Sequence, residues 1–99
     1  EYSAAKGGVL SFTRALAKEV AAYGINVNCV SPGVIGTERV SQMSPDTVQG
    51  WLEGIPLRRL GTPKEVARVV LFLASSDSDY ITGENISVAG GMTLGPAGY

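Results

Sequence analysis

Apolar residues in the first quarter of the chain recur at helical spacing. Four of them, three or four positions apart, lie on one stripe of a helix: Val9, Phe12, Leu16 and Val20. The pattern predicts an amphipathic helix over residues 3–23. Gly24 can end this helix in the left-handed conformation of a C-cap.

Two short segments have the composition of β-strands. Residues 25–30 alternate Ile25, Val27 and Cys29 with asparagines, and residues 85–89 form a second short segment of this kind. Strands joined through helices lie parallel, with a right-handed connection. The predicted class is therefore α/β, with two parallel strands and three to four helices.

The clearest helix start is Thr62-Pro63-Lys64-Glu65, a capping box with proline at the first helical position. The predicted helix runs to about Ala74. Its apolar residues cover all sides: Val66, Ala67, Val69, Val70, Leu71, Phe72 and Leu73. Such a helix is expected to be buried between a sheet and another subunit.

Residues 37–57 are more polar, and Trp51 and Leu52 are their main apolar anchors. Ser44 and Pro45 predict the capped start of a short helix that stops near Gly54. A capped helix in a loop after a strand is the expected arrangement of a substrate lid. Residues 94–99 lack periodicity and are read as a tail.

Composition and charge exclude several classes of function. The 99 residues, 44% apolar with a net charge of −1, describe one soluble piece with nothing to attract nucleic acid. A membrane span or leader is not indicated, and a cytoplasmic location follows weakly. The single Cys29 cannot form an internal disulfide and reads as a small buried hydrophobe. Without histidine, a Ser-His-Asp triad within the chain is excluded and a metal site is not expected.

Tyr2 and Lys6 stand four positions apart at the head of the first predicted helix. Positions i and i+4 share a helix face, so the ammonium can lie near the phenol. A nearby cation favours the ionised phenol, which suits tyrosine for acid–base work. The alternative is a half-buried tyrosine beside a solvated lysine, a pair that many helices carry by chance.

Several motifs recur in a fixed order along the chain: Tyr2-Ser3-Ala4-Ala5-Lys6, Ser31-Pro32-Gly33 with Thr37, residues 59–67, residues 81–83 and residues 89–92. Together they resemble the C-terminal part of a short-chain dehydrogenase/reductase. The resemblance implies the last two strands of a seven-stranded, Rossmann-like doubly wound sheet. Residues 1–99 would then be part of one domain, with a substrate lid at about 37–57.

The resemblance also implies a reaction and a site. Hydride would pass between the nicotinamide of NAD or NADP and a carbonyl or secondary alcohol. Tyr2 would exchange the proton, and Lys6 would favour the tyrosinate and bind the nicotinamide ribose. Cofactor contacts would come from Tyr2 and Lys6 on the first helix and from one segment after the first strand: Pro32, Gly33, Val34, Ile35 and Thr37. A homodimer or homotetramer is expected, because the family pairs the first helix with its counterpart.

Some assignments stay open. Thr37 could instead be a solvated hydroxyl, and Arg58 and Arg59 are read as a structural turn rather than phosphate ligands. Ser3 and Ser31 belong to other motifs than the substrate-orienting serine, which lies upstream in the family together with the phosphate-binding loop. Sugar 1-dehydrogenases and oxoacyl-thioester reductases both share features with the chain. The alternative function is a non-catalytic piece that keeps the family's oligomerisation surfaces.

Overall fold

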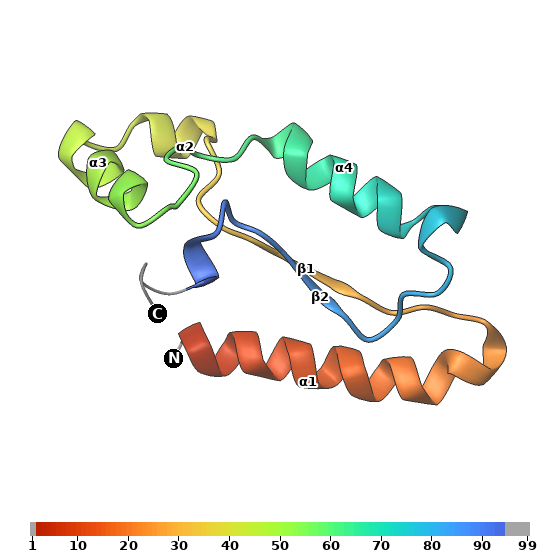
Figure 1. Ribbon diagram of the computed structural model, residues 1–99. Coiled ribbons are helices and arrows are strands. Elements are labelled where there is room, and N and C mark those ends of the chain that lie inside the picture. The colour runs from red at the N-terminus through yellow and green to blue at the C-terminus, as the bar shows by residue number, and fades with distance from the viewer. Residues whose placement is uncertain (1, 95–99) are drawn as a thin grey trace. The chain divides into compact units, whose positions relative to one another are not determined.

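The computed structural model describes residues 2–94, with side chains from residue 4 onward. The elements follow the order α1 (Tyr2–Val20), η1 (Ala21–Tyr23), β1 (Cys29–Pro32), α2 (Glu38–Ser41), α3 (Pro45–Glu53), α4 (Pro63–Leu73), η2 (Ser76–Ser78), β2 (Asn85–Val88) and η3 (Met92–Leu94), where η denotes a 3₁₀ helix (Figure 1). Apart from Leu94, the predicted tail lies outside the described residues. Within residues 2–94, no helix has the length and apolar character needed to cross a bilayer.

Strands β1 and β2 form a two-stranded parallel sheet. Cys29 N donates to Glu84 O, and Gly33 N donates to Val88 O, each at 2.9 Å. Both strands thus advance four residues in the same direction between the two bonds, as parallel pairing requires. The predicted α/β class is confirmed.

The predicted start of the first strand was wrong, because β1 begins at Cys29 rather than at residue 25. Before that point, one backbone bond from Gly83 N to Val27 O is combined with bonds made by side chains. Val27 N donates to Thr82 Oγ1 at 3.0 Å, and Asn28 Nδ2 donates to Ile81 O at 3.0 Å. The strand then continues to Pro32, which has no N–H to extend the ladder.

The described chain divides into two compact units. Residues 2–30 and 70–86 form the first unit, and residues 31–69 and 87–94 form the second. Each unit is described separately below.

In the first unit, α1 confirms the predicted helix but buries a different stripe. Thr13 and Ala17 are only 5% and 4% exposed, whereas Phe12 of the predicted stripe keeps 67% of its surface. Small residues allow a close approach here, since a Cβ on Gly83 would lie 3.6 Å from the Ala17 Cβ. The buried Thr13 hydroxyl donates to Val9 O at 2.8 Å, so its burial leaves no unsatisfied donor. Gly24, at φ 73°, is the predicted left-handed cap, placed after the short η1 turn.

In the second unit, Ser44 caps α3 as predicted, and its Oγ accepts from Thr47 N at 3.2 Å. The sequence did not predict the four-residue helix α2, which Thr37 caps. The loop after α3 buries Ile55, which is 1% exposed. Helices α2 and α3 occupy the predicted lid segment, whose function as a lid stays a prediction.

The capping box at the start of α4 is confirmed. Thr62 Oγ1 accepts from Glu65 N at 3.1 Å, and Glu65 Oε1 accepts from Thr62 N at 3.0 Å. Within the described residues, no side chain of α4 is buried, and Leu71 is 69% exposed. The expected burial of this helix against a sheet and another subunit therefore stays a prediction.

Candidate functional site

Helix α1 carries Tyr2 and Lys6 in the first unit. Its backbone is helical from Tyr2 onward, so the two residues stand on one face as their spacing predicted. Lys6 is exposed, and the Tyr2 side chain lies outside the described part of the chain. The structure therefore supports the shared helical face, while the roles of the two side chains stay a prediction.

The other predicted site residues belong to the second unit and form what we call the 32–37 turn. The turn leaves β1 at Pro32, and Thr37 N donates back to Ile35 O at 2.8 Å. Gly33 lies tightly against Ala89, the residue after β2, because a Cβ built on Gly33 would be 2.8 Å from both Cα and Cβ of Ala89. Only glycine fits this approach without displacing backbone.

Thr37 has a structural role that the sequence did not reveal. Its Oγ1 accepts from Val40 N at 3.4 Å as the N-cap of α2. A hydroxyl that accepts through one lone pair can still donate its proton. Thr37 is exposed, so capping leaves its hydroxyl able to donate to a ligand at the turn.

A second segment supports the 32–37 turn, and sequence analysis missed it. Ile35 and Gly61 form an isolated parallel bridge, in which Gly61 N donates to Val34 O at 3.0 Å and Gly36 N donates to Gly61 O at 2.8 Å. Both bonds are made by residues that flank Ile35, so the N–H of Ile35 itself points away from Gly61. No local spacing signals this pairing, because its partners are far apart in sequence.

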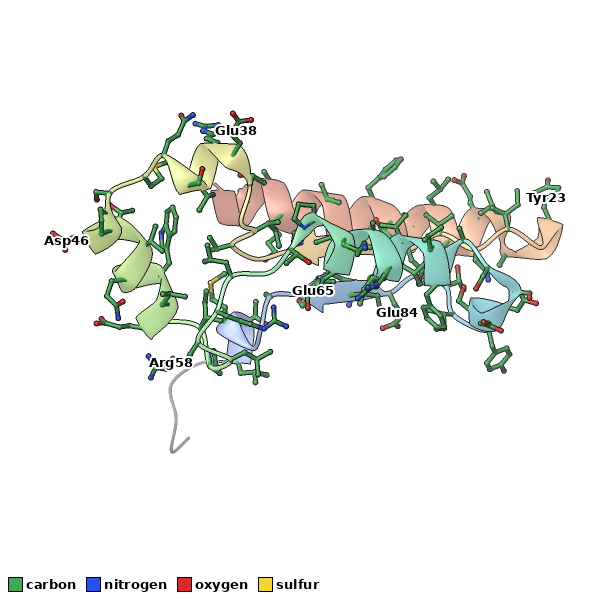
Figure 2. All side chains as sticks on the ribbon, turned by 90° about the horizontal axis from the view of Figure 1, so that it is seen from above. Tyr23, Glu38, Asp46, Arg58, Glu65 and Glu84 are labelled. Carbon is green, nitrogen blue, oxygen red and sulfur yellow. The ribbon has the colours of Figure 1, made fainter. Side chains whose placement is uncertain are left out.

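Arg58 and Arg59 precede α4, and both have structural partners, as predicted. Arg58 has a left-handed backbone at φ 58°, and its Nη1 donates to Glu53 O at 3.1 Å. That carbonyl lies at the end of α3, where a cation also offsets the negative end of the helix dipole. Figure 2 shows Arg58 on the loop after α3 and Glu65 near the start of α4.

Arg59 forms a two-point ion pair with Glu65, at 2.9 Å from Nη1 to Oε1 and 2.8 Å from Nη2 to Oε2. Hydrogen bonds from the Arg59 side chain and from the Thr62 backbone lower the pKa of Glu65 to about 2. The same pairing raises the pKa of Arg59. Two groups that neutralise each other in this way make Arg59 a poor ligand for a cofactor phosphate.

Acid should weaken the folded state through Glu65. Its folded pKa of about 2 lies below the ordinary 4.5, so an unfolded chain takes up this proton first as the pH falls. The contribution is present above pH 4.5 and is lost as the pH falls toward 2. In thermal unfolding between pH 6 and pH 3, Glu65→Gln should therefore lose slightly less stability than the parent protein, and the difference should be small because solvent screens this exposed pair. Parallel losses would contradict this role of the carboxylate.

A cavity of about 450 Å³ lies within the second unit, beside the 32–37 turn. Its lining includes Val34 from the turn, residues 55–57 from the end of the predicted lid, and residues 87–91 from β2 and the loop after it. The volume falls in the range of small-molecule sites, and most of the lining is apolar. The charged residues in its lining are Arg59 and Glu65, which pair with each other.

Comparison with known proteins agrees with this architecture. Residues 1–93 match the family described as enoyl-(acyl carrier protein) reductase. A 3-oxoacyl-[acyl-carrier-protein] reductase FabG of Chlamydia pneumoniae is 52% identical over 92 residues, which are 93% of this chain and 37% of that protein. The FabG of Aquifex aeolicus is 50% identical, over 92% of this chain and 37% of its own length.

A solved structure shows the same fold. The crystal structure of 3-oxoacyl-[acyl-carrier protein] reductase from Brucella melitensis superimposes with a TM-score of 0.88 at 41% identity, covering 91% of this chain and 34% of that one. The chain thus spans little more than a third of the length of these relatives. It belongs to the short-chain dehydrogenase/reductase family and corresponds to part of a Rossmann-like domain.

Proposed function

We propose that these residues form the C-terminal part of an NAD(P)-dependent oxidoreductase that transfers hydride between a nicotinamide cofactor and a carbonyl or secondary alcohol. The observation that carries the proposal is the pair Tyr2 and Lys6 on one face of α1, in a chain about half identical to named reductases. The longer protein that this proposal implies is called the full-length protein below.

The residues of the 32–37 turn fit the nicotinamide end of such a cofactor. The Ile35 N–H points away from Gly61, and the exposed Thr37 hydroxyl keeps a proton to donate. These groups suit a carboxamide and a neighbouring phosphate. Lys6 would bind the ribose hydroxyls from α1. The nicotinamide, when bound, supplies or accepts the hydride.

The proton is the part of the reaction that this chain would handle. In reduction, the phenol of Tyr2 donates its proton to the carbonyl oxygen as that oxygen gains negative charge. In oxidation, the phenolate takes the proton from the alcohol. Lys6 favours the phenolate through its positive charge, which allows the same group to act in both directions near neutral pH.

We further propose a 3-oxoacyl thioester as the substrate class, since the relatives compared above are named 3-oxoacyl-[acyl-carrier-protein] reductases. The test is an absorbance assay of the full-length protein with NADPH and with NADH, using acetoacetyl thioester in one arm. A second arm uses glucose with each oxidised cofactor. Turnover with the thioester is expected. Turnover with glucose but not with the thioester would instead favour a sugar 1-dehydrogenase activity.

The isolated 99-residue chain is expected to bind either reduced cofactor weakly, because family members place the pyrophosphate at the N-terminus of a helix upstream of these motifs. Without that contact, the dissociation constant should be about 1 mM or higher, about −4 kcal/mol or weaker. A fluorescence titration with NADH and NADPH measures it. Saturation at micromolar concentration would show a complete site in these residues and contradict the proposal that they are one part of it.

The second candidate, a non-catalytic piece that keeps assembly surfaces, would use the exposed apolar side chains of this chain. Phe12 on α1 and Leu71 on α4 are 67% and 69% exposed, and Val70 is 49% exposed. Apolar surface of this kind is commonly covered by another chain, as in a symmetric homodimer or homotetramer. Light scattering on the sample used for the cofactor titration tests self-association independently of cofactor binding. A 10.3 kDa monomer would contradict self-association.

A further inference from the structure

We propose that Arg59, Thr62 and Glu65, called the Glu65 cluster, are positioning residues that hold the 32–37 turn in the shape that receives the cofactor. The inference rests on the proposed function. It assigns a role in cofactor binding to residues that the resemblance left as an ordinary structural turn.

The first step is the support of the 32–37 turn by Gly61. Two backbone bonds join them, Gly61 N to Val34 O at 3.0 Å and Gly36 N to Gly61 O at 2.8 Å. These bonds fix the peptide groups on both sides of Ile35. The position of Gly61 therefore determines where the outward N–H of Ile35 points.

The second step is the support of Gly61 by one carboxylate. Glu65 accepts four hydrogen bonds: two from the Arg59 guanidinium, and one each from Thr62 N and Thr62 Oγ1. Arg59 precedes Gly61 and Thr62 follows it, so the carboxylate joins both flanks of that glycine. Arg59 Nη1 also donates to Leu60 O at 3.2 Å, which ties the intervening backbone to the same guanidinium.

The third step compares the local and the global effect of the Glu65 cluster. The Arg59 and Glu65 side chains keep 55% and 33% of their surface, and ion pairs this exposed add little to overall stability. Their effect is expected to be local, on the fraction of molecules in which residues 59–62 are ordered. A cofactor that binds only the ordered turn loses apparent affinity in proportion to that fraction.

The test uses the full-length protein with Glu65→Ala, Glu65→Gln and the matched control Glu84→Ala. Glutamine can still accept from Thr62 N in a capping box, so it should rescue part of the effect. Glu84 is exposed, and its backbone N and O atoms bond to Asn28 and Cys29 without involving its side chain. We expect Glu65→Ala to raise the cofactor KM by about tenfold and Glu65→Gln by about two- to threefold, as the ordered fraction falls. The kcat at saturating cofactor should stay within about twofold, and Glu84→Ala should match the parent.

A merely structural role predicts a different result, in which kcat and the melting temperature fall together while the cofactor KM is unchanged. That outcome would overturn the proposal. Amide hydrogen exchange supplies a readout that needs no activity, because the Gly36 and Gly61 amides should exchange faster in Glu65→Ala than in the parent. If these amides are equally protected, the Glu65 cluster does not hold the turn. If they lose protection in a protein that has no cofactor-dependent activity, the support of the turn by the Glu65 cluster stands and the proposed function fails.

Discussion

Tyr2→Phe in the full-length protein should lower kcat by about 10²- to 10⁴-fold, the range found when a general acid or base is removed. Phenylalanine keeps the ring but has no proton to give to the substrate oxygen. Cofactor binding should stay nearly intact, since the proposed cofactor contacts come mainly from Lys6 and the 32–37 turn. Steady-state kinetics with a 3-oxoacyl thioester, combined with a cofactor titration, measures both quantities.

Tyr23→Phe is the matched control for this substitution. Tyr23 lies in η1, just after α1, and its side chain is 79% exposed. The control removes the same hydroxyl from a residue outside the proposed site and should leave kcat unchanged. Lys6→Ala should both slow turnover and weaken cofactor binding. A Tyr2→Phe variant that turns over at the parental rate would contradict the assignment of Tyr2 as the proton donor.

The parts of the fold that the sequence predicted well are those set by residues close together in the chain. Thr62 and Glu65 complete a capping box across three positions, and Ser44 and Gly24 act at helix ends through their own turns. Each signal depends on contacts within one turn of helix. Such contacts form in the same way whatever the rest of the protein does.

The parts that the sequence did not predict depend on distant partners. Asn28 lies in an alternating pattern typical of a strand. Its side-chain amide nevertheless donates to Ile81 O, a carbonyl far along the chain that the pattern does not reveal. Helix α1 buries Ala17 where the turn at Gly83 approaches it, a contact that periodicity alone cannot supply. The spacing of hydrophobic residues predicted the helix correctly. It predicted burial of Phe12, however, rather than of the smaller residues that allow close packing.

The candidate site also combines features set by neighbouring residues with features set by distant partners. The spacing of Tyr2 and Lys6 is local, and the helix that the sequence predicted places them on one face. The 32–37 turn was located by its motif, but its support by Gly61 depends on a pairing between segments far apart in sequence. The link from Glu65 through residues 59–62 to Ile35 therefore became visible only in the folded chain.

Gly33→Ala should destabilise the protein and displace the 32–37 turn. The added Cβ would lie 2.8 Å from Cα and Cβ of Ala89, and it meets backbone that cannot rotate away as a flexible side chain could. Overpacking of this kind costs about 1–3 kcal/mol. Chemical denaturation of the full-length protein measures that loss, and the cofactor KM should rise because the turn must shift to relieve the clash.

Gly50→Ala is the matched control for this second substitution. Gly50 lies in α3 of the same unit, and a Cβ there meets no described atom within 4 Å. Alanine is the better helix former by up to about 1 kcal/mol, so the control should be neutral or stabilising and leave the cofactor KM unchanged. If Gly33→Ala behaved like Gly50→Ala, the close approach of the turn to Ala89 would not control the site. If Gly33→Ala lost stability while its cofactor KM stayed at the parental value, the turn would be a packing element without a part in cofactor binding.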